Sequence, residues 1–147
     1  MEWLLLWFFR ATHVMAASAW AGGYLLFVLV LVPLLRRETT ASLMRVAVTT
    51  VRTMTYAGVG TLIFGTLLIT RTRGFASLGR GEWGWLIIAC IVIAIALLGI
   101  GDGALRPQLR KLAHAQPAPM LERVAWLGLA LSALAIILMT RALYAGN

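Results

Sequence analysis

Cysteine and acidic residues are both scarce in this sequence. The single cysteine, Cys90, lies in the middle of an apolar segment, so an internal disulfide and a cysteine-based zinc site are excluded. Asp and Glu together number five in 147 residues, and no two of them are placed as a pair of hydrolytic carboxylates. No Ser, His and Asp residues form a set for nucleophilic catalysis. The composition therefore argues against a hydrolase.

Charged residues of either sign are also few. They make up 12% of the chain, compared with roughly 25% in soluble domains, while 61% of the residues are hydrophobic. The hydrophobic residues fall in blocks of about twenty or more, the length needed to cross about 30 Å of hydrocarbon. We therefore predict an all-α integral membrane protein. It is a single domain (residues 1–147) in which four helices form a bundle with up-down topology.

The first apolar block, residues 3–35, is too long for one upright span. Because Trp favours the membrane interface and Arg extends its charge towards it, we expect Trp3, Trp7 and Arg10 at the interface. The span proper then begins near residue 11. The four predicted spans are residues 11–35, 54–70, 83–105 and 124–143.

Two further features set the boundaries of these spans. Pro33 and Pro107 are expected to end the first and third spans, because proline interrupts a helix. Residues 39–53 have apolar side chains at helical spacing, which predicts an amphipathic helix near the membrane surface that leads into the second span. No repeat with a period of 20 to 50 residues is apparent.

Basic residues exceed acidic ones, and the net charge is +8. They lie in short clusters at the ends of apolar blocks, without interleaved aromatics, so we expect contact with anionic lipids and no binding of nucleic acid. Basic residues next to spans favour the cytoplasmic side. Since the first and third connections hold more of them than the side of the termini, we predict termini on the non-cytoplasmic side, in a bacterial inner membrane. The connections hold Arg36, Arg37, Arg45, Arg52, Arg106, Arg110, Lys111 and Arg123, and the other side holds Arg10, Arg71, Arg73, Arg80 and Arg141.

His13 is the most informative residue, because an ionisable side chain in a membrane helix is costly and is by default a candidate for function. Arg10 lies one turn away, and its charge favours a neutral imidazole with a lone pair for iron, copper or a proton. Trp20, seven residues further on, lies on the same helix face. Between and beyond them run small residues, ending in Gly22 and Gly23, that admit a planar group or a neighbouring helix. The alternative is that His13 only donates a hydrogen bond to a carbonyl.

The stretch from His13 to Gly23 resembles the first-helix motif H-x6-W-x-G-G of the copper-resistance protein D (CopD) family. It is also similar to the H-x6-W-x-x-G motif of HemJ-type protoporphyrinogen oxidases, which are four-span proteins of nearly this length. The resemblance implies that His13 binds haem b, in a site that includes Arg10, Trp20, Gly22 and Gly23. The HemJ-type enzymes carry a lysine in the third span and this chain has none there, which puts the oxidase activity in question.

The cofactor is left open between haem b and copper, and no Met-rich or His-rich tract marks copper handling. His114 lies in the third connection, too far from His13 to be the opposite axial ligand. Iron is therefore expected to be five-coordinate, or to take Met139 or a ligand from another subunit. Arg10 is a candidate partner for a haem propionate and equally for a lipid phosphate.

Two other polar residues have less specific patterns. Asp102 and Arg106 are spaced as an i, i+4 ion pair, with a proton relay as the alternative for Asp102. Cys90 has the thiol that copper favours, but its apolar surroundings are typical of inert packing. His114 is expected to be a solvated loop residue.

Two functions follow from these observations. The first is a haem- or metal-binding membrane protein of CopD/HemJ-like type that works in electron transfer or oxidoreduction. The second is an accessory subunit of a larger respiratory or photosynthetic complex, in which His13 only packs and the small-residue faces contact other membrane subunits or a second copy of the chain.

Overall fold

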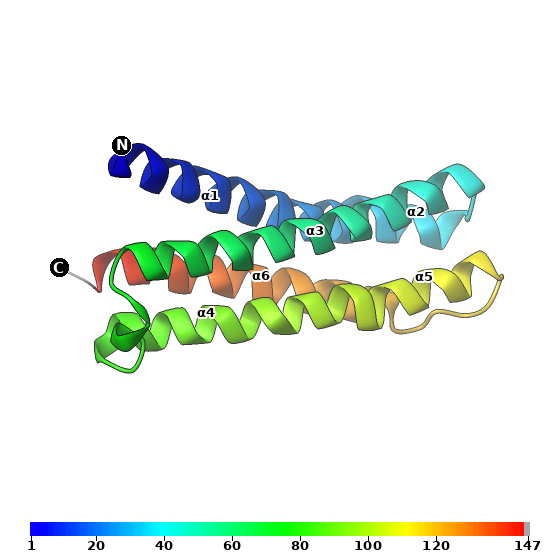
Figure 1. Cartoon of the computed structure of the whole chain (residues 1–147). Helices are drawn as coiled ribbons and strands as arrows, with labels where there is room; N and C mark the ends of the chain where they lie inside the picture. Colours follow the sequence, from blue (N-terminus) through cyan, green and yellow to red (C-terminus); the bar gives the residue numbers. More distant parts are fainter. Residues whose placement is uncertain (146–147) are drawn as a thin grey trace.

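The computed structural model describes residues 1–145, and within them all regular structure is helical. Four rods lie side by side, and α1 begins where α6 ends (Figure 1). We call the end of the bundle at which α1 begins the terminal end. We call the opposite end, which holds connections 38–40 and 114–120, the loop end. Four helical stretches are long and apolar enough to cross a membrane: Glu2–Arg37, Ala41–Arg71, Gly81–Ala113 and Leu121–Tyr144. The elements are α1 (Glu2–Leu26), η1 (Phe27–Leu31), α2 (Val32–Arg37), α3 (Ala41–Arg71), η2 (Phe75–Ser77), α4 (Gly81–Gly99), η3 (Ile100–Leu105), α5 (Arg106–Ala113) and α6 (Leu121–Tyr144).

The second rod is longer than the sequence predicts. Of residues 39–53, expected as an amphipathic helix that leads into the second span, residues 41–53 form the first part of α3. Thr40 caps this helix, since its hydroxyl accepts a hydrogen bond from the backbone N–H of Leu43 at 3.3 Å. Ala47 and Val51 are fully buried in the bundle. Part of the expected apolar stripe is therefore buried against the other helices.

The first and third rods pass through the prolines that were expected to end them. Each carries a wide π-helical turn directly before its proline, η1 before Pro33 and η3 before Pro107. In η1 the hydrogen bond reaches five residues back, from Val32 N–H to the carbonyl of Phe27. A proline ring clashes with the carbonyl four residues before it in an α-helix, and the wider turn relieves this clash. The first rod therefore extends from Glu2 to Arg37, and the third ends at Ala113 rather than near residue 105.

The two proline regions are alike in sequence as well as in structure. Leu31-Val-Pro-Leu-Leu-Arg-Arg37 in the first rod matches Leu105-Arg-Pro-Gln-Leu-Arg-Lys111 in the third, with the corresponding residues 74 positions apart (31 to 105 and 37 to 111). These rods run in the same direction, from the terminal end to the loop end (Figure 1).

The buried positions of the other two rods follow the same offset. Each buried residue of the loop-end half of α3 has a buried counterpart in α6, 74 positions later. The chain therefore consists of two equivalent helical hairpins, α1 with α3 and α4 with α6. This repeat is longer than the 20 to 50 residues considered above. The corresponding residues are Ala47 and Leu121, Val51 and Ala125, Met54 and Gly128, and Gly58 and Ser132.

Aromatic side chains placed against glycines hold the hairpins together. Trp20 of α1 covers Gly58 of α3, and Tyr24 of α1 packs on Gly128 of α6. Tyr24 is fully buried, and its hydroxyl donates a hydrogen bond to the carbonyl of Leu97 in α4 at 2.8 Å. These contacts lie in the middle of the rods and belong to the main core, which extends from there to the loop end.

We expect Gly58→Ala to destabilise the protein. The added methyl group would lie 2.7 Å from the ring of Trp20 and 2.8 Å from Leu98, so one of them must shift. Such overpacking typically costs about 1–3 kcal/mol of unfolding free energy. Gly99→Ala is the control, because its added methyl group would meet no atom of another helix within 4 Å. Unfolding in mixed detergent micelles measures both, and equal stability of the two variants would contradict this packing.

Candidate functional site

His13 lies in the terminal half of α1 and faces α3. Its Nδ1 lies 2.9 Å from the backbone carbonyl oxygen of Thr61. Gly65, one turn further along α3, allows the ring to lie close, since a Cβ at this position would be 3.0 Å from His13 Cε1. The ring is half-buried. The absence of a side chain at Gly65 therefore positions the imidazole against the backbone of α3.

The hydrogen bond decides which ring nitrogen carries the proton. A carbonyl oxygen only accepts, so Nδ1 of His13 donates, and in the neutral ring the lone pair is on Nε2. Nε2 makes no hydrogen bond with any residue in the range 1–145. A histidine that binds a metal through one ring nitrogen usually donates a hydrogen bond from the other nitrogen, often to a backbone carbonyl. The observed bond is the one expected if His13 only packs against a neighbouring helix. It is equally compatible with a histidine that binds a metal through Nε2.

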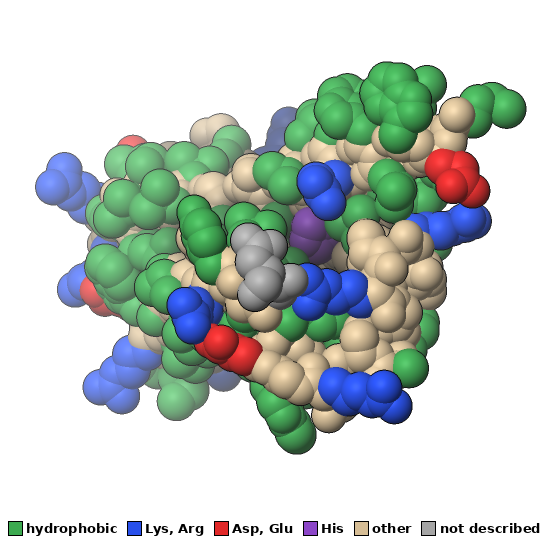
Figure 2. Space-filling view, turned by 90° about the vertical axis from the view of Figure 1, so that its left-hand side faces the viewer, with side chains coloured by type: hydrophobic (Ala, Val, Ile, Leu, Met, Phe, Trp, Pro, Cys, Tyr) green, Lys and Arg blue, Asp and Glu red, His purple; other side chains and the backbone are tan. Residues whose placement is uncertain are grey.

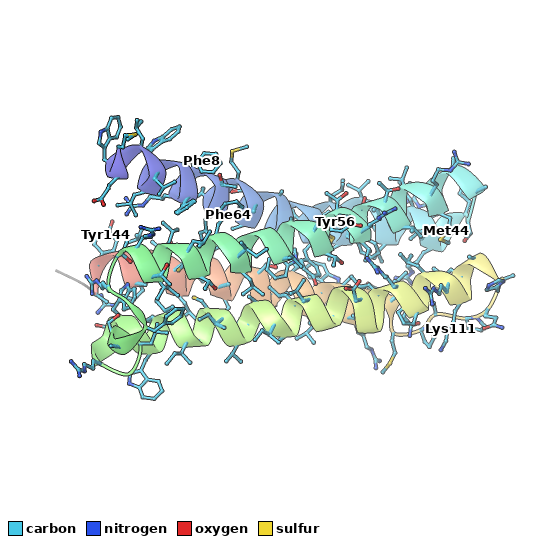
Figure 3. The ribbon with its side chains drawn as sticks, in the orientation of Figure 1. Phe8, Met44, Tyr56, Phe64, Lys111 and Tyr144 are labelled. Atoms are coloured by element: carbon cyan, nitrogen blue, oxygen red, sulfur yellow. The ribbon has the colours of Figure 1, made fainter. Side chains whose placement is uncertain are left out.

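Aromatic rings lie on the terminal side of His13. Phe8 and Phe9 of α1 meet Phe64 of α3, with ring centroids 6.3 and 6.1 Å from that of Phe64. Figure 3 shows Phe8 and Phe64 on the two neighbouring rods. Seen from the terminal end, a histidine side chain is recessed among hydrophobic and basic groups (Figure 2). The aromatic rings therefore lie towards the terminal end without closing off the histidine that is seen from there (Figure 2).

The terminal half of α1 is loosely held. Before Trp20 it contains no buried residue, and its closest contacts (Phe8, Phe9, His13 and Ala16) are with α3. In Figures 1 and 2 this part of α1 diverges from the other rods. The small core at the terminal end is formed around Ile69, Ile87 and Ala142 of the other three rods. One side of α1 near His13 is thus left without a protein neighbour among residues 1–145.

The five predicted site residues do not converge. Trp20 is buried in the main core against Gly58, and Gly23 meets the side chain of Met54. Gly22 is exposed in a shallow groove of about 260 Å³ between α1 and α3. It lies nine residues after His13, which places it on the opposite side of an α-helix. The small-residue run therefore serves helix packing and a lateral groove, and it does not line a slot beside His13.

Arg10 lies one turn before His13 and is exposed. It makes no hydrogen bond or ion pair with the residues that the structure describes, unlike Arg36, Arg106 and Arg141, which pair with carboxylates. Its guanidinium is therefore available to an anion near the terminal end, whether a propionate or a lipid phosphate.

The remaining candidates lie apart from His13. Asp102 in η3 pairs with Arg106 at 2.8 Å, as expected from their spacing, and accepts a hydrogen bond from the Thr55 hydroxyl at 3.2 Å. The thiol of Cys90 points to the carbonyl of Ala135 at 3.8 Å. His114 ends α5 at the loop end and is exposed. Among the described residues no three His, Cys, Asp or Glu side chains form a group for a metal ion.

Sequence reasoning did not connect Thr61 and Gly65 with His13, although these two residues position the imidazole. Thr61 acts through its backbone carbonyl, which every residue has, and Gly65 acts through a missing side chain. Neither carries a signal that distinguishes it from the other glycines and threonines of an apolar helix. Only the register of α1 on α3 reveals them.

Comparison with known proteins gave no match: no family model, no curated protein and no solved structure is significantly similar to this chain. The resemblance to the CopD and HemJ-type families therefore stays a prediction that depends on the segment from His13 to Gly23.

We expect His13 to be the tautomer with the proton on Nδ1. In a His114→Asn variant with ¹⁵N-labelled histidine, NMR in detergent micelles should show one protonated nitrogen, coupled as Nδ1, and an unprotonated Nε2. Adding Gly65→Ala should weaken the bond to Thr61 and change the Nδ1 signal, because the new methyl group would lie 3.3 Å from that atom. A proton found on Nε2 would contradict this geometry.

Proposed function

We propose that this chain is a membrane haem protein in which Nε2 of His13 binds the iron of haem b. The observation that carries the proposal is the 2.9 Å contact between His13 Nδ1 and the carbonyl of Thr61, which directs the proton to Nδ1 and leaves Nε2 as the basic nitrogen. A histidine that only packs between helices needs the hydrogen bond from Nδ1 but has no use for an unprotonated Nε2. Gly65 adds to it by holding the ring in one orientation.

The residues around His13 suit haem better than a copper ion. A copper ion takes several protein ligands, and no group of three or more candidate side chains is found in residues 1–145. Haem brings four nitrogen ligands of its own and needs only one from the protein. His13 supplies that one, while Arg10 is exposed one turn away for a propionate. We therefore place haem b before copper.

The site that we propose lies at the side of the bundle rather than in its centre. Trp20 and Tyr24 fill the centre, so a porphyrin ring does not fit between the four rods there. The loosely held half of α1 offers apolar surface beside His13 instead. Iron would then be five-coordinate, or would take its sixth ligand from Met139 or from another subunit, since His114 lies at the other end of the bundle.

Haem b supplies one-electron oxidation and reduction when bound, and we assign the chain to electron transfer on that basis. Its residues hold the group: His13 binds, Thr61 orients the ring through its carbonyl, and Arg10 neutralises negative charge. A protoporphyrinogen oxidase activity has less support, because the single lysine of the third rod, Lys111, is exposed in α5 at the loop end, at the other end of the bundle from His13.

We propose that the four rods cross a bacterial inner membrane in up-down order, with the terminal end on the non-cytoplasmic side. The excess of basic residues at the loop end supports this orientation. His13 and Arg10 are then closer to the outer surface, and an electron partner would dock there.

A second candidate is an accessory subunit of a larger respiratory or photosynthetic complex. The observation that favours it is the terminal half of α1, where the apolar side chains of Trp7, Val14 and Met15 are 55–72% exposed. Another membrane helix would cover this surface as readily as lipid does. The two candidates are compatible, because a haem held by one histidine can be completed by a neighbouring subunit.

We expect protein purified in mild detergent, from cells supplied with haem, to show a Soret band. His13→Ala should abolish it, because the only nitrogen ligand near the apolar surface is lost. His114→Ala is the matched control and should keep the full band. Absorption spectra and haem extraction measure both variants.

A colourless wild-type protein that elutes as a folded species would contradict haem binding. The accessory-subunit candidate is tested in the same preparation by native mass spectrometry: a mass equal to one copy of this chain at every detergent concentration would contradict it. The absorption spectrum tests haem binding and the mass tests the association with other subunits, so either proposal can fail without the other.

A further inference from the structure

A groove at the loop end has the charge pattern of a phospholipid site. It has a volume of about 510 Å³ and lies between the first rod and the first turns of α6. We call it the Arg36 groove. Its lining residues are Val28, Leu29, Val32, Pro33, Arg36, Arg37, Glu122 and Trp126.

The groove changes from apolar to basic along the helix axis. Val28 and Val32 are each 4% exposed and form its floor, and Arg36 follows one turn later at the loop end. Leu29 on one side and Trp126 on the other are 56% and 50% exposed and form its walls. An acyl chain suits the deep apolar part, and a headgroup suits the basic rim, where Trp side chains also favour the interface.

The charge at the rim matches a single phosphodiester. Arg36 pairs with Glu122 across the groove at 2.8 Å, which ties α2 to α6 and neutralises one positive charge. Arg37 is exposed and makes no hydrogen bond or ion pair within residues 1–145. One positive charge is therefore left at the mouth, complementary to one negative charge on a ligand.

The second hairpin shows that this groove is particular to the first. The residues 74 positions after Val28 and Val32 are Asp102 and Arg106, which form an ion pair at 2.8 Å. A charged pair stands where the first hairpin has its apolar floor. Arg110 and Lys111, the counterparts of Arg36 and Arg37, thus have the same place on their rod, with an ion pair in place of the two valines.

We propose that the Arg36 groove binds a single anionic phospholipid from the bilayer. Its phosphate lies between Arg36 and Arg37, and one acyl chain lies along Val28 and Val32. The inference is independent of the haem proposal, since His13 lies in the other half of the same rod. It names a lipid rather than free phosphate, because the apolar floor and walls recognise an acyl chain and only the rim recognises the phosphate.

The test is native mass spectrometry of the full chain in detergent, titrated with phosphatidylglycerol or with phosphatidylcholine of identical acyl chains. We expect the wild-type protein to retain one phosphatidylglycerol in preference to phosphatidylcholine. Arg37→Gln should weaken the retention about fivefold, the effect of one basic residue near a membrane surface. Glu122→Gln should strengthen it by a similar factor, because Arg36 is then free for the phosphate. These two variants have opposite expected effects, so a general loss of folding cannot mimic both.

The matched control is Arg110→Gln with Lys111→Gln, which removes two positive charges at the same end of the bundle and should leave the retention as in the wild type. Millimolar inorganic phosphate should not displace the lipid. The proposal is overturned if the wild type shows no preference, if the control loses retention as Arg37→Gln does, if Glu122→Gln weakens retention, or if inorganic phosphate competes the lipid away.

Discussion

The structure depends on close approach between its helices, because helices long and apolar enough to cross a bilayer gain no hydrophobic driving force from contact with one another there. Lipid chains are as apolar as leucine, so van der Waals contact and buried hydrogen bonds must hold the rods together. Tyr24 supplies both: it packs on Gly128 of α6 and donates to the carbonyl of Leu97 in α4. Trp20 on Gly58 adds a second contact of this kind. Two aromatic side chains of α1 thereby join all four rods.

These contacts lie in the middle of the bundle, and their position accounts for the difference between its two ends. From Trp20 to the loop end α1, η1 and α2 are built into the main core. Towards the terminal end, α1 contacts α3 through Phe8, Phe9 and His13. His13 lies in that loosely held half, where a large group has access, while the Arg36 groove lies at the well-packed end, where its walls are fixed. The candidate haem site thus depends on the loosely held half of the first rod, and the Arg36 groove depends on its well-packed half.

Much of the architecture could be predicted from hydropathy alone. The four apolar blocks, the pair of Asp102 with Arg106, and the position of His114 away from His13 all follow from local spacing. The ends of the first and third rods could not be predicted from Pro33 and Pro107, because a π turn before each proline relieves the steric clash of its ring. Such a turn has no clear sequence signature. The positions of Gly22 and Gly23 relative to His13 could not be predicted for a related reason, since neighbours in sequence need not share a helix face.

By itself, the sequence determined that the chain is helical and apolar enough to cross a membrane four times, and that His13 is its one histidine in an apolar helix. Length and hydropathy are properties of consecutive residues, so no knowledge of packing is needed to read them. Only the tertiary structure decided which atoms His13 meets, that its free nitrogen is Nε2, and that the two hairpins are equivalent. These facts depend on the register between helices, which is set by where glycines such as Gly58, Gly65 and Gly128 allow a neighbouring side chain to fit.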